Sequence, residues 1–196
     1  MQTHTLNTTK TKIHIRNMIC DSCLKVVKWE LERTGFIQVA HVALGTADIA
    51  YNAGVINLAF VGAVLSRNGF ELIENKELVI VEQIKTSMIQ LIFFGNNTNS
   101  ILRNSDFLSQ KLGIPYPTLT KLFSKYNDVT LEKYIIQLKI EKVKELLNYD
   151  EMSLSEIAYL MGYSSVAHLS KQFKLVTGYG VIDYKKDLQR IPLNKL

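Results

Sequence analysis

The chain has 196 residues, a formal net charge of +5, 47% hydrophobic residues and 21% charged residues, which is an ordinary globular composition. The longest apolar run, 53–65, is shorter than the roughly 20 residues that a bilayer crossing requires, so we expect no transmembrane helix. The polar N-terminus, "MQTHTLNTTK", lacks the apolar core of a secretory signal. We therefore expect a cytoplasmic protein whose two cysteines are reduced.

The positive charge is concentrated in the C-terminal half of the chain. Residues 1–95 contain nine basic and eight acidic residues, whereas residues 96–196 contain fourteen and ten. A basic excess of this kind suits a polyanionic partner, although many basic proteins never contact nucleic acid. The charge pattern alone therefore does not assign a function.

The N-terminal elements follow the order strand, helix, strand, strand, helix, strand. In "KIHIRN", Ile13 and Ile15 alternate with polar residues, which predicts a half-buried strand. Apolar residues at spacings of three and four then predict an amphipathic helix over 23–34. The remaining pattern predicts strands at 36–44 and 47–51, a helix at 55–68 and a strand at 70–73. This order predicts a ferredoxin-like βαββαβ sandwich over 11–76, with both cysteines in its first strand-to-helix loop.

A helical stripe follows this domain, with Val81, Ile84, Met88 and Leu91 at spacings of three, four and three residues. We expect the helix 77–94 to pack on either neighbouring domain, and a homodimer seam is the alternative. The polar tract "GNNTNS" closes a connecting segment, 77–100, and the C-terminal domain is expected over 101–190.

The C-terminal half contains two copies of one pattern. At a constant offset of 50 residues, five positions correspond, among them Lys121 with Lys171 and Phe123 with Phe173. In the second copy, the "SLSE" that begins at Ser153 forms a capping box, a short helix follows, and a glycine turn leads to a second helix. Each copy is therefore predicted to be a helix-turn-helix unit.

A periodic helix over 131–148 is expected between the two copies. Its 18 residues would span about 27 Å at 1.5 Å per residue. Two recognition helices held near that separation could enter successive major grooves of DNA. A single chain could thus read an asymmetric site.

Residues 105–190 closely resemble the DNA-binding domain of the AraC/XylS family of bacterial transcription regulators. The stretch "SLSEIAYLMGYSSVAHLSKQFKLVTG" matches the second helix-turn-helix signature of that family almost throughout. The resemblance implies promoter DNA as a partner, with RNA polymerase as a further one. The implied DNA-binding positions are Pro117, Thr118, Thr120, Lys121, Lys125, Ser165, Val166, Ala167, His168, Ser170, Lys171 and Lys174.

The resemblance also suggests how those positions divide. A lysine at 121 or 171 could reach the acceptors of guanine, whereas Pro117, Val166 and Ala167 could only contact a thymine methyl group or leave the groove unread. Lys125, Lys174 and Lys185 are expected to bind phosphates. His168 could contact DNA or remain a solvated surface residue. One departure is Val181, which stands where the family usually has proline, so the last helix is expected to start less sharply.

The N-terminal half looks like a heavy-metal-associated domain, whose first loop carries Met-x-Cys-x-x-Cys. Here that motif is Met18, Cys20 and Cys23, with Asn17 in the place of the usual glycine. The resemblance implies a metal ion at the two cysteines. Met18 is expected to belong to the core, because the family buries this position.

Two thiolates at a helix N-terminus are stabilised as anions and favour soft ions such as Cu(I), for which two ligands suffice. Zn(II) is a second candidate, although it prefers four ligands and the local sequence supplies two. Asp21, His14 or His41 could add a ligand. Cys20 and Cys23 could instead form a redox-active pair, or be an inherited pair that binds nothing.

These patterns predict an α+β protein with an N-terminal ferredoxin-like sandwich and a C-terminal all-α double helix-turn-helix domain. We expect a sequence-specific DNA-binding transcription regulator that responds to a soft metal ion. The alternative is a cytoplasmic metal-binding or chaperone-type protein whose helical half contacts only proteins. No phosphate-binding loop, H-E-x-x-H or G-x-S-x-G motif occurs, so we do not expect an enzyme.

Overall fold

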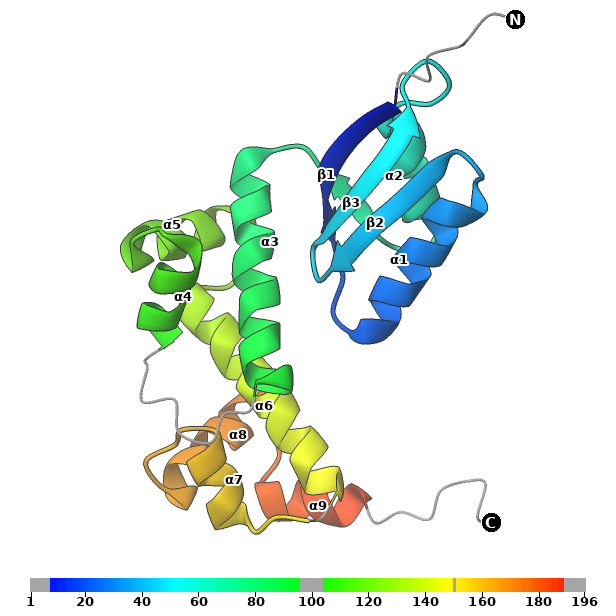
Figure 1. Ribbon diagram of the computed structural model, residues 1–196. Coiled ribbons are helices and arrows are strands. Elements are labelled where there is room, and N and C mark those ends of the chain that lie inside the picture. Colours follow the sequence, from blue (N-terminus) through cyan, green and yellow to red (C-terminus); the bar gives the residue numbers. More distant parts are fainter. Residues whose placement is uncertain (1–7, 96–103, 150, 189–196) are drawn as a thin grey trace, which may run out of the picture. The chain divides into compact units, whose positions relative to one another are not determined.

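The computed structural model of the protein describes residues 8–95, 104–149 and 151–188 (Figure 1). The chain divides into two compact units, each built from two separate segments of the sequence. The first unit comprises Met1–Ser87 and Leu108–Tyr126, and the second comprises Met88–Phe107 and Asn127–Leu196. The first unit contains a four-stranded sheet, and the regular structure described in the second is helical, so the fold is α+β. Most of the predicted polar tract, 96–100, lies outside the described residues.

The sheet is antiparallel throughout and has the order β2-β3-β1-β4. In the central strand β1, Ile13 pairs with Ala47 of β3, and Ile15 pairs with Leu72 of β4. A turn at Gly45, with a φ of 82°, joins β2 to β3, and this left-handed conformation suits glycine. The four strands are β1 Thr8–Arg16, β2 Ile37–Ala43, β3 Thr46–Asn52 and β4 Glu71–Ile73.

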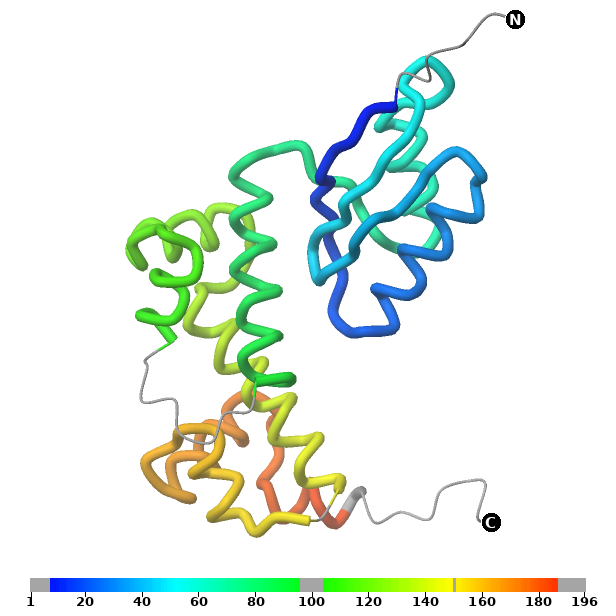
Figure 2. Tube along the Cα trace, in the orientation of Figure 1, coloured from blue at the N-terminus to red at the C-terminus, as the bar shows by residue number. Residues whose placement is uncertain are grey.

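Two helices, α1 at Asp21–Arg33 and α2 at Leu58–Ser66, lie against the sheet (Figure 2). They share one apolar core with alternate residues of the strands. Val27 and Leu31 of α1 and Ile15 of β1 are fully buried in it. The observed element order, β1-α1-β2-β3-α2-β4, agrees with the order predicted from the sequence. The period-2 and period-3.6 patterns identified these elements because one face of each is buried.

The predicted helix over 77–94 consists of two segments with different backbone geometry. An α-helix, α3, covers Lys76–Ile89, and a π-helical turn, η1, covers Gln90–Phe94. Val81, Ile84 and Met88 of the predicted stripe are buried within the chain. The stripe therefore packs inside the protein, and the switch to π geometry lies close to the boundary between the two compact units.

The C-terminal half is helical in the part that the structure describes. The second helix-turn-helix unit buries Ile157, Leu169 and Phe173 in a core that it shares with the preceding long helix. Its capping box forms as predicted, because Ser153 and Glu156 bond reciprocally. The helices are α4 Asn104–Leu112, α5 Tyr116–Tyr126, α6 Leu131–Tyr149, α7 Leu154–Leu160, α8 Val166–Thr177 and α9 Val181–Leu188.

Within residues 8–95, 104–149 and 151–188, none of the helices combines the length and the apolarity needed to cross a membrane.

Candidate nucleic-acid interface and cysteine pair

Helices α7 and α8 form the second helix-turn-helix unit. Gly162, with a φ of 71°, provides the turn between them, and Ser165 caps α8 by accepting a hydrogen bond from the backbone N–H of His168 at 3.1 Å. Leu169 and Phe173 point into the core and have no exposed surface. Because Leu169 and Phe173 bury one face of α8, the opposite face of the helix is exposed to solvent.

The predicted DNA-binding positions of the second unit lie at the start and on the outer side of α8. Val166 and Ser170 are partly buried, and the exposed members are Ser165, Ala167, His168, Lys171 and Lys174. An α-helix with an exposed, polar outer side and a buried apolar side has the form of a DNA recognition helix.

The side chain of His168 is held in place by two neighbours. The Oγ atom of Ser164 lies 3.1 Å from Nδ1 of His168, and the ring of Tyr163 packs edge-on against the imidazole with centroids 5.3 Å apart. These two contacts were not predicted from the sequence, although both residues lie within five positions of His168. The imidazole is therefore oriented before any ligand binds.

A lysine from α6 supports the turn of the same unit. Nζ of Lys139 donates a hydrogen bond to the backbone carbonyl of Met161 at 2.8 Å and lies 5.7 Å from the ring centroid of Tyr163. Burial lowers the pKa of Lys139 and raises the pKa of Tyr163. This contact links α6 to the turn of the helix-turn-helix and was not predicted, because 22 residues separate the partners.

The first helix-turn-helix unit consists of α4 and α5, with Gly113 at its turn. Pro117, Thr118 and Lys121 are exposed at the start and on the outer side of α5. Thr120 is partly buried, and its hydroxyl donates a hydrogen bond to the carbonyl oxygen of Pro117 at 2.9 Å. Lys121 is thus the exposed cation that corresponds to Lys171 of the second unit.

Lys125 of α5 is engaged by a residue that no sequence pattern indicated. Its ammonium group forms an ion pair with the carboxylate of Glu77 on α3, and the hydroxyl of Tyr126 donates to the same carboxylate. Lys125 and then Tyr126 lower the pKa of Glu77, and Glu77 raises the pKa of Lys125. The expected phosphate contact of Lys125 would thus compete with Glu77.

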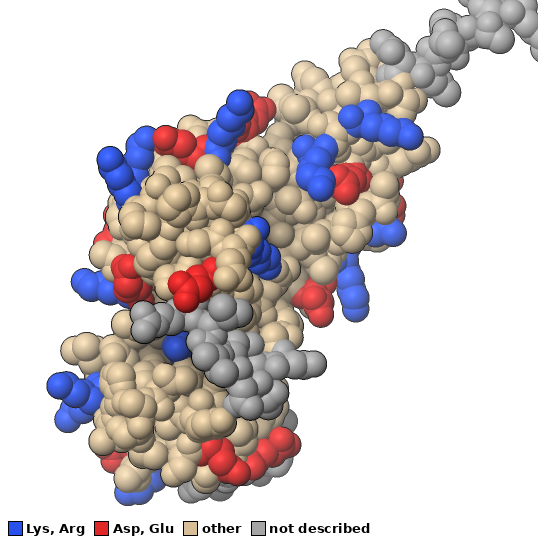
Figure 3. Space-filling view, turned by 60° about the vertical axis from the view of Figure 1, so that its left-hand side comes forward, with Lys and Arg blue, Asp and Glu red and all other residues tan. Residues whose placement is uncertain are grey.

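On the face shown in Figure 3, Lys and Arg side chains are separated by uncharged surface and by Asp and Glu side chains. The basic groups described on this face are thus dispersed. Attraction of a polyanion would rest on individual lysines, each of which contributes separately to the salt dependence of binding.

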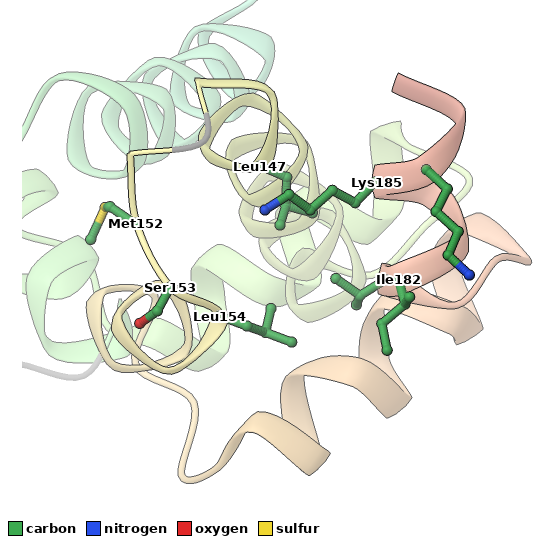
Figure 4. A pocket seen from close by; sticks show the side chains of 8 residues that line it. Leu147, Met152, Ser153, Leu154, Ile182 and Lys185 are labelled. Carbon is green, nitrogen blue, oxygen red and sulfur yellow. The ribbon is translucent and has the colours of Figure 1, made fainter. Parts of the chain in front are cut away.

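A hollow of about 240 Å³ lies where the end of α6, the start of α7 and helix α9 meet. Figure 4 shows Leu147, Leu154 and Ile182 around it, with the side chain of Lys185 reaching from α9 toward Leu147. Val181, at the position of the usual proline, is buried, and α9 begins at this residue. The ring of Tyr184 packs against Phe173 at 5.3 Å, so α9 closes the unit despite the missing proline.

The cysteine pair lies at the N-terminus of α1, as predicted. Cys20 is the N-cap residue, and its Sγ atom is 3.6 Å from Sγ of Cys23, so the thiols are free but adjacent. The backbone N–H of Cys23 and then its side chain lower the pKa of the Cys20 thiol. A lowered pKa at a helix N-terminus favours the thiolate, which is the form that binds metals and reacts with electrophiles.

The residues before the cysteines hold the loop in place. Met18 is fully buried in the core of the sheet domain, which agrees with its predicted core role. Asn17 has a φ of 71°, a left-handed conformation that asparagine tolerates better than most residues. Its side-chain amide donates to the carbonyl oxygen of Gly69 at 3.0 Å, so the α2–β4 turn supports the loop. Asparagine is therefore compatible with the backbone conformation at this position.

The described part of the chain assembles no third ligand beside the two thiols. Among the residues that the structure describes, no group of three or more His, Cys, Asp or Glu side chains could hold a metal ion. The suggested additional ligands, Asp21, His14 and His41, therefore do not complete a set with Cys20 and Cys23 in this arrangement. Two sulfur ligands suit a soft ion that accepts low coordination better than Zn(II).

Comparison with known proteins gives a family-model match in the C-terminal half of the chain. Residues 108–187 match the family model described as "Helix-turn-helix domain". The Msm operon regulatory protein of Streptococcus mutans is 30% identical over 90 residues, which is 46% of this chain and 32% of that protein. The transcriptional activator RhaS of Escherichia coli is 30% identical over 71 residues, covering 36% of this chain and 26% of RhaS.

Among solved structures, the C-terminal domain of AraT, a response regulator from Geobacillus stearothermophilus, is 20% identical with a TM-score of 0.48. That similarity covers 58% of this chain and 88% of the AraT chain. The present chain spans between a quarter and a third of the length of the two regulators above. The region 108–187 thus covers most of the two helix-turn-helix units that the structure describes, α4–α5 and α7–α8.

Proposed function

We propose that this protein is a sequence-specific DNA-binding transcription regulator that uses both helix-turn-helix units. The observation that carries this proposal is the matching placement of Lys121 on α5 and Lys171 on α8, each exposed opposite a buried Leu-Phe pair. Equivalent cations on two recognition helices suit two successive contacts with the major groove. The names of the two relatives, an operon regulatory protein and a transcriptional activator, support the same function.

The outer residues of α8 divide into two roles in this proposal. Lys171 and the oriented His168 read base edges, and Val166 and Ala167 contact thymine methyl groups. Lys174, one turn further along the helix, binds a phosphate and fixes the position of the helix. On α5, Lys121 is the principal base-reading group, since Thr120 is bonded to the backbone.

Replacing Lys121 or Lys171 with alanine is expected to weaken binding to the preferred DNA site by about 5-fold to 150-fold, the equivalent of 1–3 kcal/mol. The preferred site is first selected from a randomised duplex pool, and affinity is then measured by fluorescence anisotropy at several salt concentrations. Lys28→Ala is the matched control, because Lys28 is an exposed lysine on α1 and lies outside both helix-turn-helix units. Wild-type affinity and salt slope in both variants would refute the DNA-reading assignment.

The N-terminal domain, in the same proposal, has a ferredoxin-like fold and binds Cu(I) through Cys20 and Cys23. The adjacent sulfur atoms, the lowered pKa of Cys20 and the lack of a third ligand among the described side chains support a soft, two-coordinate ion. When bound, the ion would join the two thiolates at the start of α1. The regulator would thereby report the availability of a soft metal.

Anaerobic titration with Cu(I) under reducing conditions is expected to saturate at one ion per wild-type chain, and Zn(II) is expected to bind more weakly. The double variant Cys20→Ser/Cys23→Ser should take up no Cu(I), because oxygen ligands are poor substitutes for thiolate with this ion. Equal uptake by wild type and the double variant would eliminate the site. Preferred binding of Zn(II) would instead favour the second candidate ion.

Two further interactions stay predictions: a homodimer whose interface is the helix 77–94, and a contact with RNA polymerase. Because Val81, Ile84 and Met88 are buried within the chain, a dimer seam would need another side of that helix. A redox-responsive pair stays an alternative to metal binding, since the two sulfur atoms are only 3.6 Å apart.

A further inference from the structure

The side chain of His168 lies on the first turn of the second recognition helix. Ser165 is the N-cap residue, so His168 occupies the third helical position of α8, and it is exposed. In a helix-turn-helix, residues near the N-terminus of the recognition helix contact base edges in the major groove. The position of His168 therefore suits the reading of a base, provided that the imidazole presents one defined nitrogen atom.

Two serines precede α8 and have different roles. Oγ of Ser165 accepts a hydrogen bond from the backbone N–H of His168 at 3.1 Å and so caps the helix. Oγ of Ser164 lies 3.1 Å from Nδ1 of the His168 imidazole. Because Ser165 already supplies the cap, the hydroxyl of Ser164 is not needed to start the helix. The hydrogen bond that the structure describes for this hydroxyl instead orients the side chain of His168.

A second contact fixes the plane of the imidazole. The ring of Tyr163 meets it edge-on, with an interplanar angle of 90° and ring centroids 5.3 Å apart. Tyr163 is itself anchored, because its backbone N–H donates to the carbonyl oxygen of Ala158 on α7 at 2.9 Å. Nζ of Lys139 on α6 lies 5.7 Å from the centroid of the same ring. The imidazole therefore rests against a side chain that two other helices of its own compact unit hold in place.

The contact with Ser164 leaves Nε2 as the ring nitrogen available to DNA. Among the residues that the structure describes, the side-chain hydrogen bond of His168 engages Nδ1, and none engages Nε2. When the hydroxyl donates to Nδ1, the neutral ring carries its proton on Nε2, and the charged ring carries a proton on both nitrogens. Nε2–H is a donor in both states. Guanine offers such a donor two acceptors in the major groove, N7 and O6, whereas cytosine offers only an amino group and adenine has an amino group beside N7.

We propose that Ser164 is a positioning residue that directs Nε2–H of His168 to a guanine in the major groove. Tyr163 holds the plane of the ring, and Ser164 determines which of its two edges is turned outward. Without the hydroxyl of Ser164, the ring would turn about its last side-chain bond, for which a histidine has two broad preferences, and would present either nitrogen. This inference rests on the proposed DNA-binding function and adds the atom, the base and the supporting residue by which α8 reads one base pair.

Replacing His168 with alanine identifies the base pair that the imidazole reads. Preferred sites are selected from a randomised duplex pool with the full wild-type chain and with His168→Ala. The base pair whose preference is lost in the variant is the one that His168 reads, and it is expected to contain guanine. Exchange of this pair for any other should weaken wild-type binding by about fivefold, the usual effect of one hydrogen bond.

Guanine analogues locate the acceptor within that base pair. The base 7-deazaguanine has a carbon atom in place of N7, and 6-thioguanine has the weaker acceptor sulfur in place of O6. One of the two should weaken wild-type binding by about fivefold and leave the binding of His168→Ala unchanged, because that variant has no donor to lose.

Ser164→Ala tests the positioning role at an exposed position where the fold is not at risk. Its preference for guanine at that base pair should fall below about twofold, since the hydrogen bond to guanine is no longer favoured over the alternatives. Preferences at the other base pairs and the salt dependence should stay as in wild type, because no phosphate contact changes. Ser164→Thr keeps the hydroxyl and should restore the preference. Ser155→Ala, at an exposed serine of α7, is the matched control and should behave as wild type.

The outcomes separate the two proposals. A wild-type chain that binds no duplex at low salt refutes the DNA-binding function and this inference together. Identical sites selected by wild type and His168→Ala refute base reading by His168 alone. Selection of an A·T pair at its position, or no effect of either guanine analogue, overturns the assignment of guanine. A wild-type preference in Ser164→Ala, or a loss that Ser164→Thr does not restore, refutes the positioning role of Ser164.

Discussion

Replacing Phe173 with alanine is expected to lower the free energy of unfolding of the C-terminal helical core by about 3–5 kcal/mol, the usual cost of truncating a buried aromatic residue. The Phe173 side chain has no exposed surface and lies in a core with Ile157 and Leu169. It also packs edge-on against Tyr184, so the substitution would loosen the contact between α8 and α9. A loss of this size is a large part of the stability of a small domain.

Urea denaturation followed by far-ultraviolet circular dichroism measures this loss. The matched control is Leu175→Ala, two residues along the same helix, because Leu175 is 79% exposed and should change stability by less than about 0.5 kcal/mol. Similar losses in the two variants would show that Phe173 is not the inner anchor of the second recognition helix.

Replacing Met18 with alanine is expected to cost about 2–5 kcal/mol, because its side chain is fully buried in the core of the sheet domain. Met18→Leu, which keeps the volume, should cost less than about 1.5 kcal/mol. Ile19→Ala is the matched control, since Ile19 is the next residue and is 62% exposed. It should leave the stability nearly unchanged.

The same variants decide between a core role and a ligand role for Met18. If its thioether only fills the core, Met18→Leu retains the Cu(I) affinity of wild type in an anaerobic competition with a chelator. A tenfold weaker affinity in a stably folded Met18→Leu variant would identify the sulfur atom as a third ligand. The proposed two-coordinate site would then be wrong.

Local patterns in the sequence were sufficient to predict several features of the described fold. The order of the strands and helices in the N-terminal half and the capping box at Ser153 both agree with the structure. Each of these features depends on the spacing of residues that are close together in the sequence. The position of Cys20 at a helix N-terminus follows for the same reason.

Other features depend on contacts between distant parts of the chain. The ion pair between Lys125 and Glu77 joins residues 48 positions apart, and the hydrogen bond between Lys139 and Met161 joins residues 22 positions apart. Single polar contacts of this kind follow no period, so no sequence pattern indicates them. The π-helical turn after Ile89 likewise interrupts a stripe that continues without a break in the sequence.

The sequence by itself therefore determined the order of the strands and helices, the two helix-turn-helix units and the adjacent thiols, because secondary structure and repeats depend on local spacing. Only the tertiary structure decided that Lys125 is paired, that His168 is oriented by its neighbours, and that Glu77 of α3 contacts the end of α5. Those facts depend on which side chains meet after the chain has folded, and folding brings together residues that local patterns treat as independent.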